Sequence, residues 1–155
     1  MKKVMLITDG GCIGNPGPGG WACIIRFGEK STELSGSERE TTNNRMELRA
    51  AIEGLRALKE PCEVTITSDS QYVIKGITEW IHGWKRRGWV KPDKQPVLNK
   101  DLWMELDFQS DRHNTKWEWT KGHANHADNN RCDELAQRAA KEQISQLSPE
   151  WVPQP

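Results

Sequence analysis

Apolar residues along the first third of the chain fall into short runs that predict strands. A nearly continuous apolar run over 4–8 ends in Asp9-Gly10-Gly11 and indicates a buried strand followed by a turn. Strands are also predicted over 21–27 and, more weakly, over 30–34. Gly28-Glu29 between them is typical of a tight hairpin. The segment 14–20, rich in glycine and proline, is expected to be a loop.

From Asn44 onward the apolar spacing changes to that of helices alternating with strands. Apolar residues at i, i+3, i+4 and i+7 predict an amphipathic helix over 44–59, which Pro61 ends. A strand is expected over 63–68, and Asp69-Ser70 closes it and caps a helix over about 71–81. The pattern continues with a helix over about 101–110, a strand over 116–120 and a helix over about 129–144.

This order of elements predicts an α/β fold. Three strands form an antiparallel meander, and the later strands alternate with helices, which favours a five-stranded mixed sheet flanked by helices. No internal repeat or linker interrupts the pattern, so residues 1–147 are expected to form one domain. The tail over 148–155 contains three prolines and is expected to be flexible.

The charge of the chain is balanced overall but unevenly distributed. The 22 basic and 22 acidic residues give no global argument for a nucleic-acid partner. Residues 75–100, however, hold seven basic and two acidic residues, and three tryptophans are interleaved with them. Such a segment is typical of a basic binding face on an otherwise acidic protein.

The cysteines and the apolar runs indicate where the protein works. The four cysteines form no CxxC pair and no secretory signal precedes them, which predicts free thiols in a reducing, cytoplasmic compartment. No apolar run approaches the roughly 20 residues that a helix needs to cross a bilayer, so no membrane partner is expected.

Four acidic residues stand where their carboxylates could converge. Asp9 and Asp69 follow predicted strands, and Glu47 and Asp133 stand near the starts of predicted helices. Neighbouring carboxylates need a neutralising charge, and hard oxygen ligands suit Mg²⁺ or Mn²⁺. Each acid alone also has an ordinary explanation, as a turn residue or, for Glu47 with Asn44, as half of a capping box. The metal-site hypothesis therefore depends on the whole set.

Several short motifs resemble those of the bacterial type I ribonuclease H family (ribonuclease HI), and they occur in the family's order and with its spacing. The resemblance covers about residues 3–140. The motifs that carry it are Ile7-Thr8-Asp9-Gly10, Gly14-Asn15-Pro16-Gly17-Pro18-Gly19-Gly20, Thr41-Thr42-Asn43-Asn44-Arg45-Met46-Glu47, Asp69-Ser70-Gln71-Tyr72, Trp117-Glu118-Trp119, Lys121-Gly122-His123 and Cys132-Asp133-Glu134-Leu135-Ala136.

The resemblance implies a ribonuclease H-like fold and an activity. The expected enzyme is a monomeric endonuclease that hydrolyses the RNA strand of RNA–DNA hybrids with little sequence specificity, leaving 5′-phosphate and 3′-hydroxyl ends. It would depend on Mg²⁺, with Mn²⁺ as a possible substitute. Asp9, Glu47, Asp69 and Asp133 resemble the family's metal-binding catalytic carboxylates, and His123 the histidine that assists proton transfer or product departure.

The resemblance also implies a substrate-binding set. Minor-groove contacts are expected from Asn15, Asn43, Asn44 and Gln71, a DNA-phosphate pocket from Thr42 and Asn99, an aromatic deoxyribose contact from Trp80, and a basic protrusion from Trp84, Lys85, Arg86, Arg87 and Trp89. Core packing is the competing explanation for the tryptophans, and a solvated face for the basic residues.

Two departures from the family pattern bear on activity. Glu40 stands where relatives often have a basic residue near the DNA phosphate, and Asn130 where many have a glutamate three residues before Asp133. Other functions stay open: a catalytically weak binding module of the same fold, a related nuclease such as a Holliday-junction resolvase or integrase core, or a zinc protein. The zinc ligands would be His123, His126, Cys132 and Cys12, whose spacing is poor for zinc.

Overall fold

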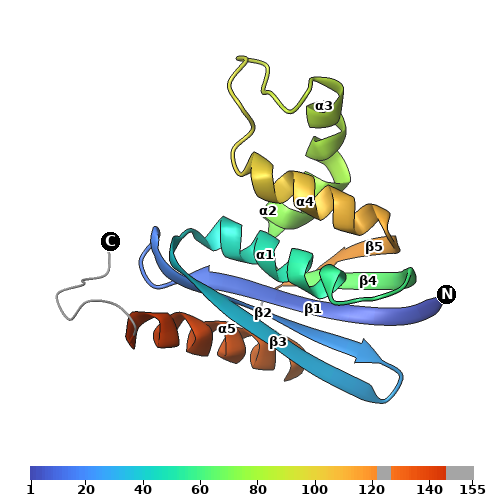
Figure 1. Ribbon diagram of the computed structural model, residues 1–155, viewed down its shortest axis with the longest axis vertical. Helices are drawn as coiled ribbons and strands as arrows, with labels where there is room; N and C mark the ends of the chain where they lie inside the picture. The colour runs from blue at the N-terminus through green and yellow to red at the C-terminus, as the bar shows by residue number, and fades with distance from the viewer. Residues whose placement is uncertain (122–126, 146–155) are drawn as a thin grey trace.

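The computed structural model, which describes residues 1–121 and 127–145, has a five-stranded mixed sheet (Figure 1). Its strands are β1 (Lys2–Cys12), β2 (Gly17–Phe27), β3 (Lys30–Thr41), β4 (Cys62–Ser68) and β5 (Asn114–Trp119), in the order β3-β2-β1-β4-β5. β2 is antiparallel to β1 and to β3, whereas β4 is parallel to β1 and to β5. The predicted fold class, with the first three strands antiparallel, is confirmed.

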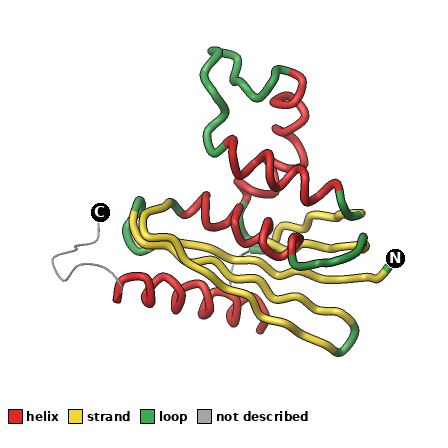
Figure 2. The backbone as a smooth tube through the Cα atoms, viewed as in Figure 1, coloured by secondary structure: helices red, strands yellow, loops and turns green. Residues whose placement is uncertain are grey.

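Helices cover both faces of the sheet (Figure 2). They are α1 (Asn43–Arg56), α2 (Gln71–Lys75), the π-helical turn η1 (Gly76–Trp80), α3 (Ile81–Arg86), α4 (Lys100–Asp111) and α5 (Ala127–Ser145). α1 lies on one face with α4 above it, and α5 lies on the opposite face (Figure 1). Among the described residues, no helix has the length and apolar character that crossing a membrane requires.

The expected loop over 14–20 is partly wrong, because Gly17–Gly20 begin β2. There Gly20 pairs with Gly11 of β1. A Cβ on Gly20 would collide with the carbonyl oxygen of Ala136 in α5, so this glycine permits close packing of α5 on the sheet. The glycines of this segment, which predicted a loop, thus include one that allows α5 to lie close to β2.

The expected single helix over 71–81 is instead α2, η1 and α3, which follow one another as far as Arg86. In the intervening π turn, the Thr78 hydroxyl donates to the carbonyl oxygen of Ile74 at 2.6 Å, a side-chain bond that competes with the regular helix ladder. A Cβ on Gly76 would collide with the ring of Trp103, so the turn lies directly against α4.

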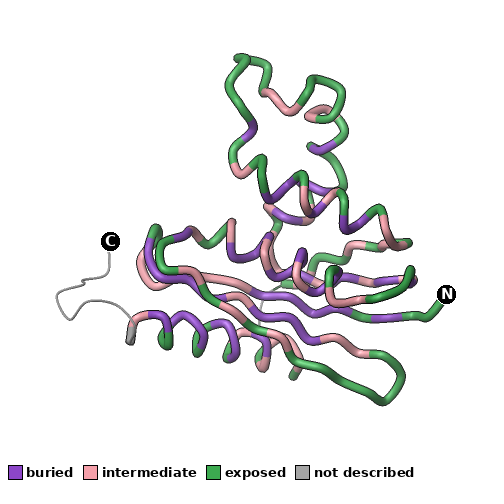
Figure 3. Tube along the Cα trace, in the orientation of Figure 1, coloured by how far each residue is buried: buried purple, intermediate pink, exposed green. Residues whose placement is uncertain are grey.

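Two hydrophobic cores hold these layers together. The larger lies between α1 and the sheet and continues under α4, whereas the smaller lies between α5 and the sheet (Figure 3). The α1 core includes Leu6, Leu48, Ile52, Leu55, Val64, Ile66, Trp103 and Leu106, and the α5 core consists of Ile7, Ala22, Ile24, Cys132, Leu135 and Ala136. Each large buried side chain contributes about 1.5–3 kcal/mol of apolar transfer, so both helices are firmly fixed on the sheet.

Candidate active site

The parallel pairing of β1 with β4 places two acids side by side towards the carboxyl ends of these strands. Each paired residue of β1 lies beside the residue sixty positions later, as Ile7 does beside Thr67. Two residues further along, Asp9 and Asp69 therefore stand level. Glu47 reaches them from α1, and ligand oxygens of all three acids lie within 4.8 Å of one another. The structure thus brings three of the four expected carboxylates together.

Glu47 is held in this cluster by the two neighbouring strands. Its Oε1 accepts the Gly10 main-chain N–H at 2.5 Å, and its Oε2 accepts the Ser68 hydroxyl at 3.5 Å. A Cβ on Gly10 would lie 2.6 Å from the carbonyl oxygen of Met46, so only glycine lets β1 approach α1 this closely. The sequence motif Asp9-Gly10 therefore supplies both an acid and the space for a second one.

The start of α1 differs from the capping-box interpretation. The N-cap is Thr42, whose Oγ1 accepts the Arg45 N–H at 3.2 Å. Asn44 is an exposed residue inside the helix. Glu47 consequently lies in the second turn, where its side chain faces the sheet and takes no part in capping.

Burial makes the three-acid cluster electrostatically unfavourable without a counter-charge. Asp9 is 8% exposed and Glu47 7% exposed. Burial, reinforced by the charge of Asp69, raises the pKa of Asp9 to about 7. Burial, followed by the charges of Asp9 and Asp69, raises the pKa of Glu47 well above its usual range. Such oxygen-only clusters fit a hard divalent cation, which removes the repulsion that the protons otherwise relieve.

Asp133 lies beside this cluster, in the second turn of α5. Its Oδ2 accepts a hydrogen bond from Gln137 Nε2 at 2.8 Å, and its charge contributes to the raised pKa of Asp9. Together with Gly10 and Asn43 it lines a cavity of about 290 Å³ between the end of β1 and α5. The fourth expected carboxylate is thus near the other three without belonging to their tight group. His123, the fifth catalytic candidate, lies outside the described residues.

The side chains of Asn15 and Asn43 join the end of β1 to α1. Asn43 Oδ1 accepts the Cys12 N–H at 2.9 Å, and Asn15 Oδ1 accepts the Asn43 N–H at 3.2 Å. Both amide oxygens are thereby occupied, whereas the amide NH₂ groups have no acceptor among the described residues. Asn44 and Gln71, at the starts of α1 and α2, are also exposed. The amide NH₂ groups of the exposed Asn15 and Asn43 are therefore available to donate to a partner.

Thr42 and Asn99 are brought together by Arg45. The Arg45 main chain donates to Thr42, and its Nη1 donates to Asn99 Oδ1 at 3.2 Å. Asn99 immediately precedes α4, as Thr42 precedes α1. Two helix N-termini therefore converge at this point, and their dipoles favour an anion.

The expected aromatic residues belong to a packed cluster. It consists of Tyr72, Trp80, Trp84, Trp89 and Trp103, with ring centroids 5.2–6.4 Å apart in each contacting pair. Trp84 and Trp89 are partly buried and pack against the larger core, so packing accounts for both of them. Trp80 is 40% exposed and presents a surface to solvent.

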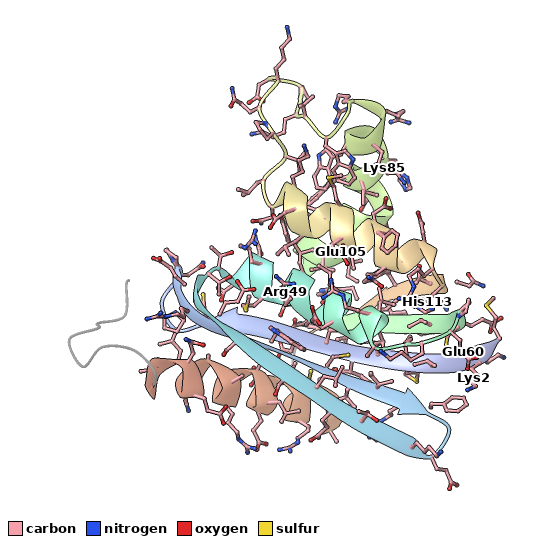
Figure 4. The ribbon with its side chains drawn as sticks, in the orientation of Figure 1. Lys2, Arg49, Glu60, Lys85, Glu105 and His113 are labelled. Atoms are coloured by element: carbon pink, nitrogen blue, oxygen red, sulfur yellow. The ribbon has the colours of Figure 1, made fainter. Side chains whose placement is uncertain are left out.

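The basic residues of α3 and its C-terminal end are not equivalent. Lys85 (Figure 4) forms an ion pair with Asp107 of α4 at 3.1 Å. Arg86 and Arg87 are exposed, and neither forms an ion pair in the described part of the chain. A binding surface here would therefore depend mainly on the two arginines.

The cysteines argue against the zinc interpretation. Cys132 is fully buried, and its Sγ donates to the carbonyl oxygens of Ile7 and Ala22 at 3.4 and 3.2 Å. Burial raises the pKa of this thiol far above its usual range, which disfavours the thiolate that zinc requires. Cys12 instead donates towards Asn43 and Asn15.

Sequence reasoning missed the residues that support the site. Four groups bond to candidate residues: the Gly10 N–H and the Ser68 hydroxyl to Glu47, and Arg45 and the Tyr72 hydroxyl to Asn99. None of these groups indicates a functional site from the sequence alone. Two local signals were available: Ser68 directly precedes Asp69, and Arg45 follows the N-cap Thr42 by three residues.

Comparison with known proteins shows the family of this chain. The family model for RNase H matches residues 1–141. The chain is 68% identical over 143 residues to the ribonuclease H of Solibacter usitatus, covering 92% of this chain and 98% of that protein. It is 61% identical over 140 residues to the ribonuclease H of Erythrobacter litoralis, covering 90% and 97%. Among solved structures, LC9-RNase H1, described as a type 1 RNase H with the type 2 active-site motif, matches with a TM-score of 0.84 and 34% identity over 92% of this chain and 74% of that one. The chain therefore belongs to the RNase H family, the endonucleases that hydrolyse RNA in RNA–DNA hybrids.

Proposed function

We propose that this chain cleaves the RNA strand of RNA–DNA hybrids with Mg²⁺ held by Asp9, Glu47, Asp69 and Asp133, with Mn²⁺ as a possible substitute. The carrying observation is the cluster of three carboxylates whose oxygens lie within 4.8 Å, two of them buried. When bound, a pair of such ions would supply the Lewis acidity that lowers the pKa of an attacking water and stabilises the leaving 3′ oxygen of an in-line displacement. The products would carry a 5′-phosphate and a 3′-hydroxyl.

The protein's own contribution is to fix the carboxylate oxygens before substrate arrives. The Gly10 N–H and the Ser68 hydroxyl orient Glu47, which leaves little freedom in a buried side chain. Asp133, at the edge of the cavity, completes the set from α5. We assign His123 to proton transfer or product departure, on the family resemblance of its motif alone.

Recognition of the RNA strand would use its 2′-hydroxyls. Asn15, Asn43, Asn44 and Gln71 offer amide groups around the end of β1 and the starts of α1 and α2. The occupied oxygens of Asn15 and Asn43 leave their NH₂ groups to donate in a minor groove. Because such contacts do not read base identity, little sequence specificity is expected.

Recognition of the DNA strand would use a phosphate and a sugar. Thr42 and Asn99 stand at two converging helix N-termini, which suits a phosphate. Trp80, exposed at the edge of the aromatic cluster, suits a deoxyribose, which has no 2′-hydroxyl to interfere with apolar contact.

The basic protrusion would add affinity without taking part in the chemistry. The exposed Arg86 and Arg87 would bind phosphates, whereas Lys85 is already paired with Asp107. Trp84 and Trp89 pack this segment against the core. Its contribution should be sensitive to salt. We further propose a monomer working in the cytoplasm, which is consistent with the four free cysteines.

A cleavage assay with four labelled substrates tests the proposal. RNA–DNA hybrid, double-stranded RNA, double-stranded DNA and single-stranded RNA are incubated with Mg²⁺, with and without EDTA. Cleavage confined to the RNA strand of the hybrid, and lost in EDTA, supports it. Asp69→Asn should abolish that cleavage, and Asp111→Asn, a matched change at the end of α4, should leave it intact.

The same assay separates the alternative, a catalytically weak binding module. Absence of cleavage in Mg²⁺ and in a Mn²⁺ repeat, with hybrid binding retained, would favour it. Glu40 and Asn130 are then the residues to change first, because both are exposed and both depart from the family pattern.

A further inference from the structure

Asn99 adopts a left-handed backbone conformation before α4 and does not cap that helix with its side chain. It precedes α4 in the left-handed region, with φ 60° and ψ 29°, and its side chain makes no capping bond to the helix. An asparagine before a helix normally accepts a main-chain N–H there, and losing such a cap costs about 1 kcal/mol. The side chain is therefore committed to another role.

The amide of Asn99 is held from both ends by residues of two other helices. Its Oδ1 accepts from Arg45 Nη1 of α1 at 3.2 Å, and its Nδ2 donates to the Tyr72 hydroxyl of α2 at 3.1 Å. Arg45 is itself fixed by two bonds to Asp101, at 3.1 and 2.9 Å. Because the Arg45 guanidinium donates to the amide oxygen and the Tyr72 hydroxyl accepts from the amide nitrogen, the orientation of the Asn99 amide is determined.

The Tyr72 hydroxyl is fixed in turn by the core. It accepts the indole N–H of fully buried Trp103 at 3.0 Å, and the two rings pack with centroids 5.2 Å apart. Tyr72 thus links the buried Trp103 of α4 to Asn99, the residue that immediately precedes α4. After these bonds, Asn99 Nδ2 retains one N–H with no acceptor among the described residues, which is the donor a phosphate needs.

We propose that Tyr72 is a positioning residue for the DNA strand: its hydroxyl aims the remaining N–H of Asn99 at a phosphate of the hybrid's DNA strand. This inference rests on the proposed function. Tyr72 touches neither the metal site nor the reacting phosphodiester in this account, and it acts only through Asn99. Removing the hydroxyl should therefore weaken substrate binding and leave the chemical step unchanged.

The test is a double-mutant cycle on hybrid cleavage. Tyr72→Phe keeps the ring and removes the hydroxyl that accepts from both Asn99 and Trp103. KM for the hybrid should therefore rise about 3- to 10-fold with kcat unchanged. In an Asn99→Ala background the same change should add less than about 2-fold, because its target is gone. Effects that multiply instead would overturn the proposal, as would an unchanged KM in Tyr72→Phe.

A second readout separates positioning from lost stability. Single methylphosphonates placed along the DNA strand remove one phosphate charge at a time. The native protein should be sensitive at one position, and Tyr72→Phe should lose sensitivity at that position alone. Thr115→Val, which removes the hydroxyl bonded to Ser110 at 2.9 Å far from this pocket, is the matched control. It should lower the melting temperature and leave both KM and the methylphosphonate profile unchanged.

Failure of the proposed function itself would be recognised separately. If the unaltered protein cleaves no hybrid, the cycle is repeated on hybrid binding in EDTA, measured by fluorescence anisotropy. Loss of affinity in Tyr72→Phe that disappears in the Asn99→Ala background would support the positioning role without any cleavage. Equal hybrid affinity of Tyr72→Phe and the unaltered protein would disprove the positioning role of Tyr72.

Discussion

The main-chain N–H of Gly10 and the Oε1 oxygen of Glu47 lie 2.5 Å apart, which fastens the end of β1 to the second turn of α1. Gly10→Ala should disrupt this contact, because its Cβ would lie 2.6 Å from the Met46 carbonyl oxygen. We expect a stability loss of about 1–3 kcal/mol and a large loss of kcat. Gly11→Ala is the control, since its Cβ would meet its nearest neighbour at 3.6 Å. Urea unfolding and hybrid cleavage of both variants measure the difference, and equal behaviour would contradict the account of Gly10.

Asp9→Asn should reduce cleavage to background while hybrid binding is retained, because it removes metal-binding charge and no proposed groove contact. It should also raise the melting temperature of the metal-free protein, since it removes a buried charge that Asp69 repels. Asp93→Asn, an exposed acid in the connection between α3 and α4, is the control. Retained cleavage in Asp9→Asn would remove Asp9 from the site.

The metal-free protein should lose stability as pH rises. The folded-state pKa of Asp9 is about 7, against 3.8 for an unperturbed aspartate, and that of Glu47 is raised as well. Between those values the folded state holds more protons than the unfolded state, so its advantage is complete at low pH and is lost as pH rises to about 7. Urea unfolding in EDTA at about pH 5.5 and 8 measures this. Mg²⁺ should remove this loss of stability at high pH by replacing the protons, and a pH profile unaffected by Mg²⁺ would argue against metal binding here.

His113 should make an opposite contribution, visible when Mg²⁺ is present. Its Nδ1 accepts the Cys62 N–H at 3.0 Å, linking the end of α4 to the start of β4 (Figure 4). Burial, with Arg112 nearby, lowers the pKa of His113 below the usual 6.5. The unfolded state then takes up the proton first, so stability should fall as pH drops through 6.5. His113→Gln should flatten this dependence in thermal melts, and His82→Gln, an exposed control, should not.

Neutralising the two free arginines should weaken substrate binding more than neutralising the paired lysine. Arg86→Gln with Arg87→Gln should raise KM and lower the slope of log KM against log salt by about 1–2, with kcat little changed. Lys85→Gln should have a smaller effect, because its ammonium is shared with Asp107. KM measured across a salt series distinguishes them. Identical salt slopes in all variants would make this segment a solvated face.

The sequence allowed the order of elements to be predicted because hydrophobic periodicity reflects burial directly. It also indicated that Asp9 and Asp69 would lie side by side if the strands before them were neighbours, and the parallel pairing of β1 and β4 meets that condition. The extent of β3 was underestimated, since this edge strand is largely exposed and its polar residues carry no apolar alternation. The break between α2 and α3 was missed because Gly76 meets Trp103, which lies far away in sequence.

The supporting residues of the site could not be predicted for a related reason. Tyr72 has an ordinary position on a short helix, and its importance arises only when Asn99 and Trp103 meet its hydroxyl. Likewise, the three-acid cluster depends on how closely α1 approaches β1, which no periodicity encodes. Asp133 was assigned with the others from its motif, and the structure places it at the edge of the adjoining cavity.

The close approach of Gly10 to α1 has a consequence for how activity and folding are related. The three clustered acids come from β1, from α1 and from the residue that follows β4, so none of these segments carries the cluster when separated from the others. If these acids form the active site, a nascent or partly melted chain that lacks α1 on its sheet would be unable to cleave hybrid RNA. The proposed site would then be its own folding checkpoint, and residual hybrid cleavage during denaturation should track the natively assembled population alone.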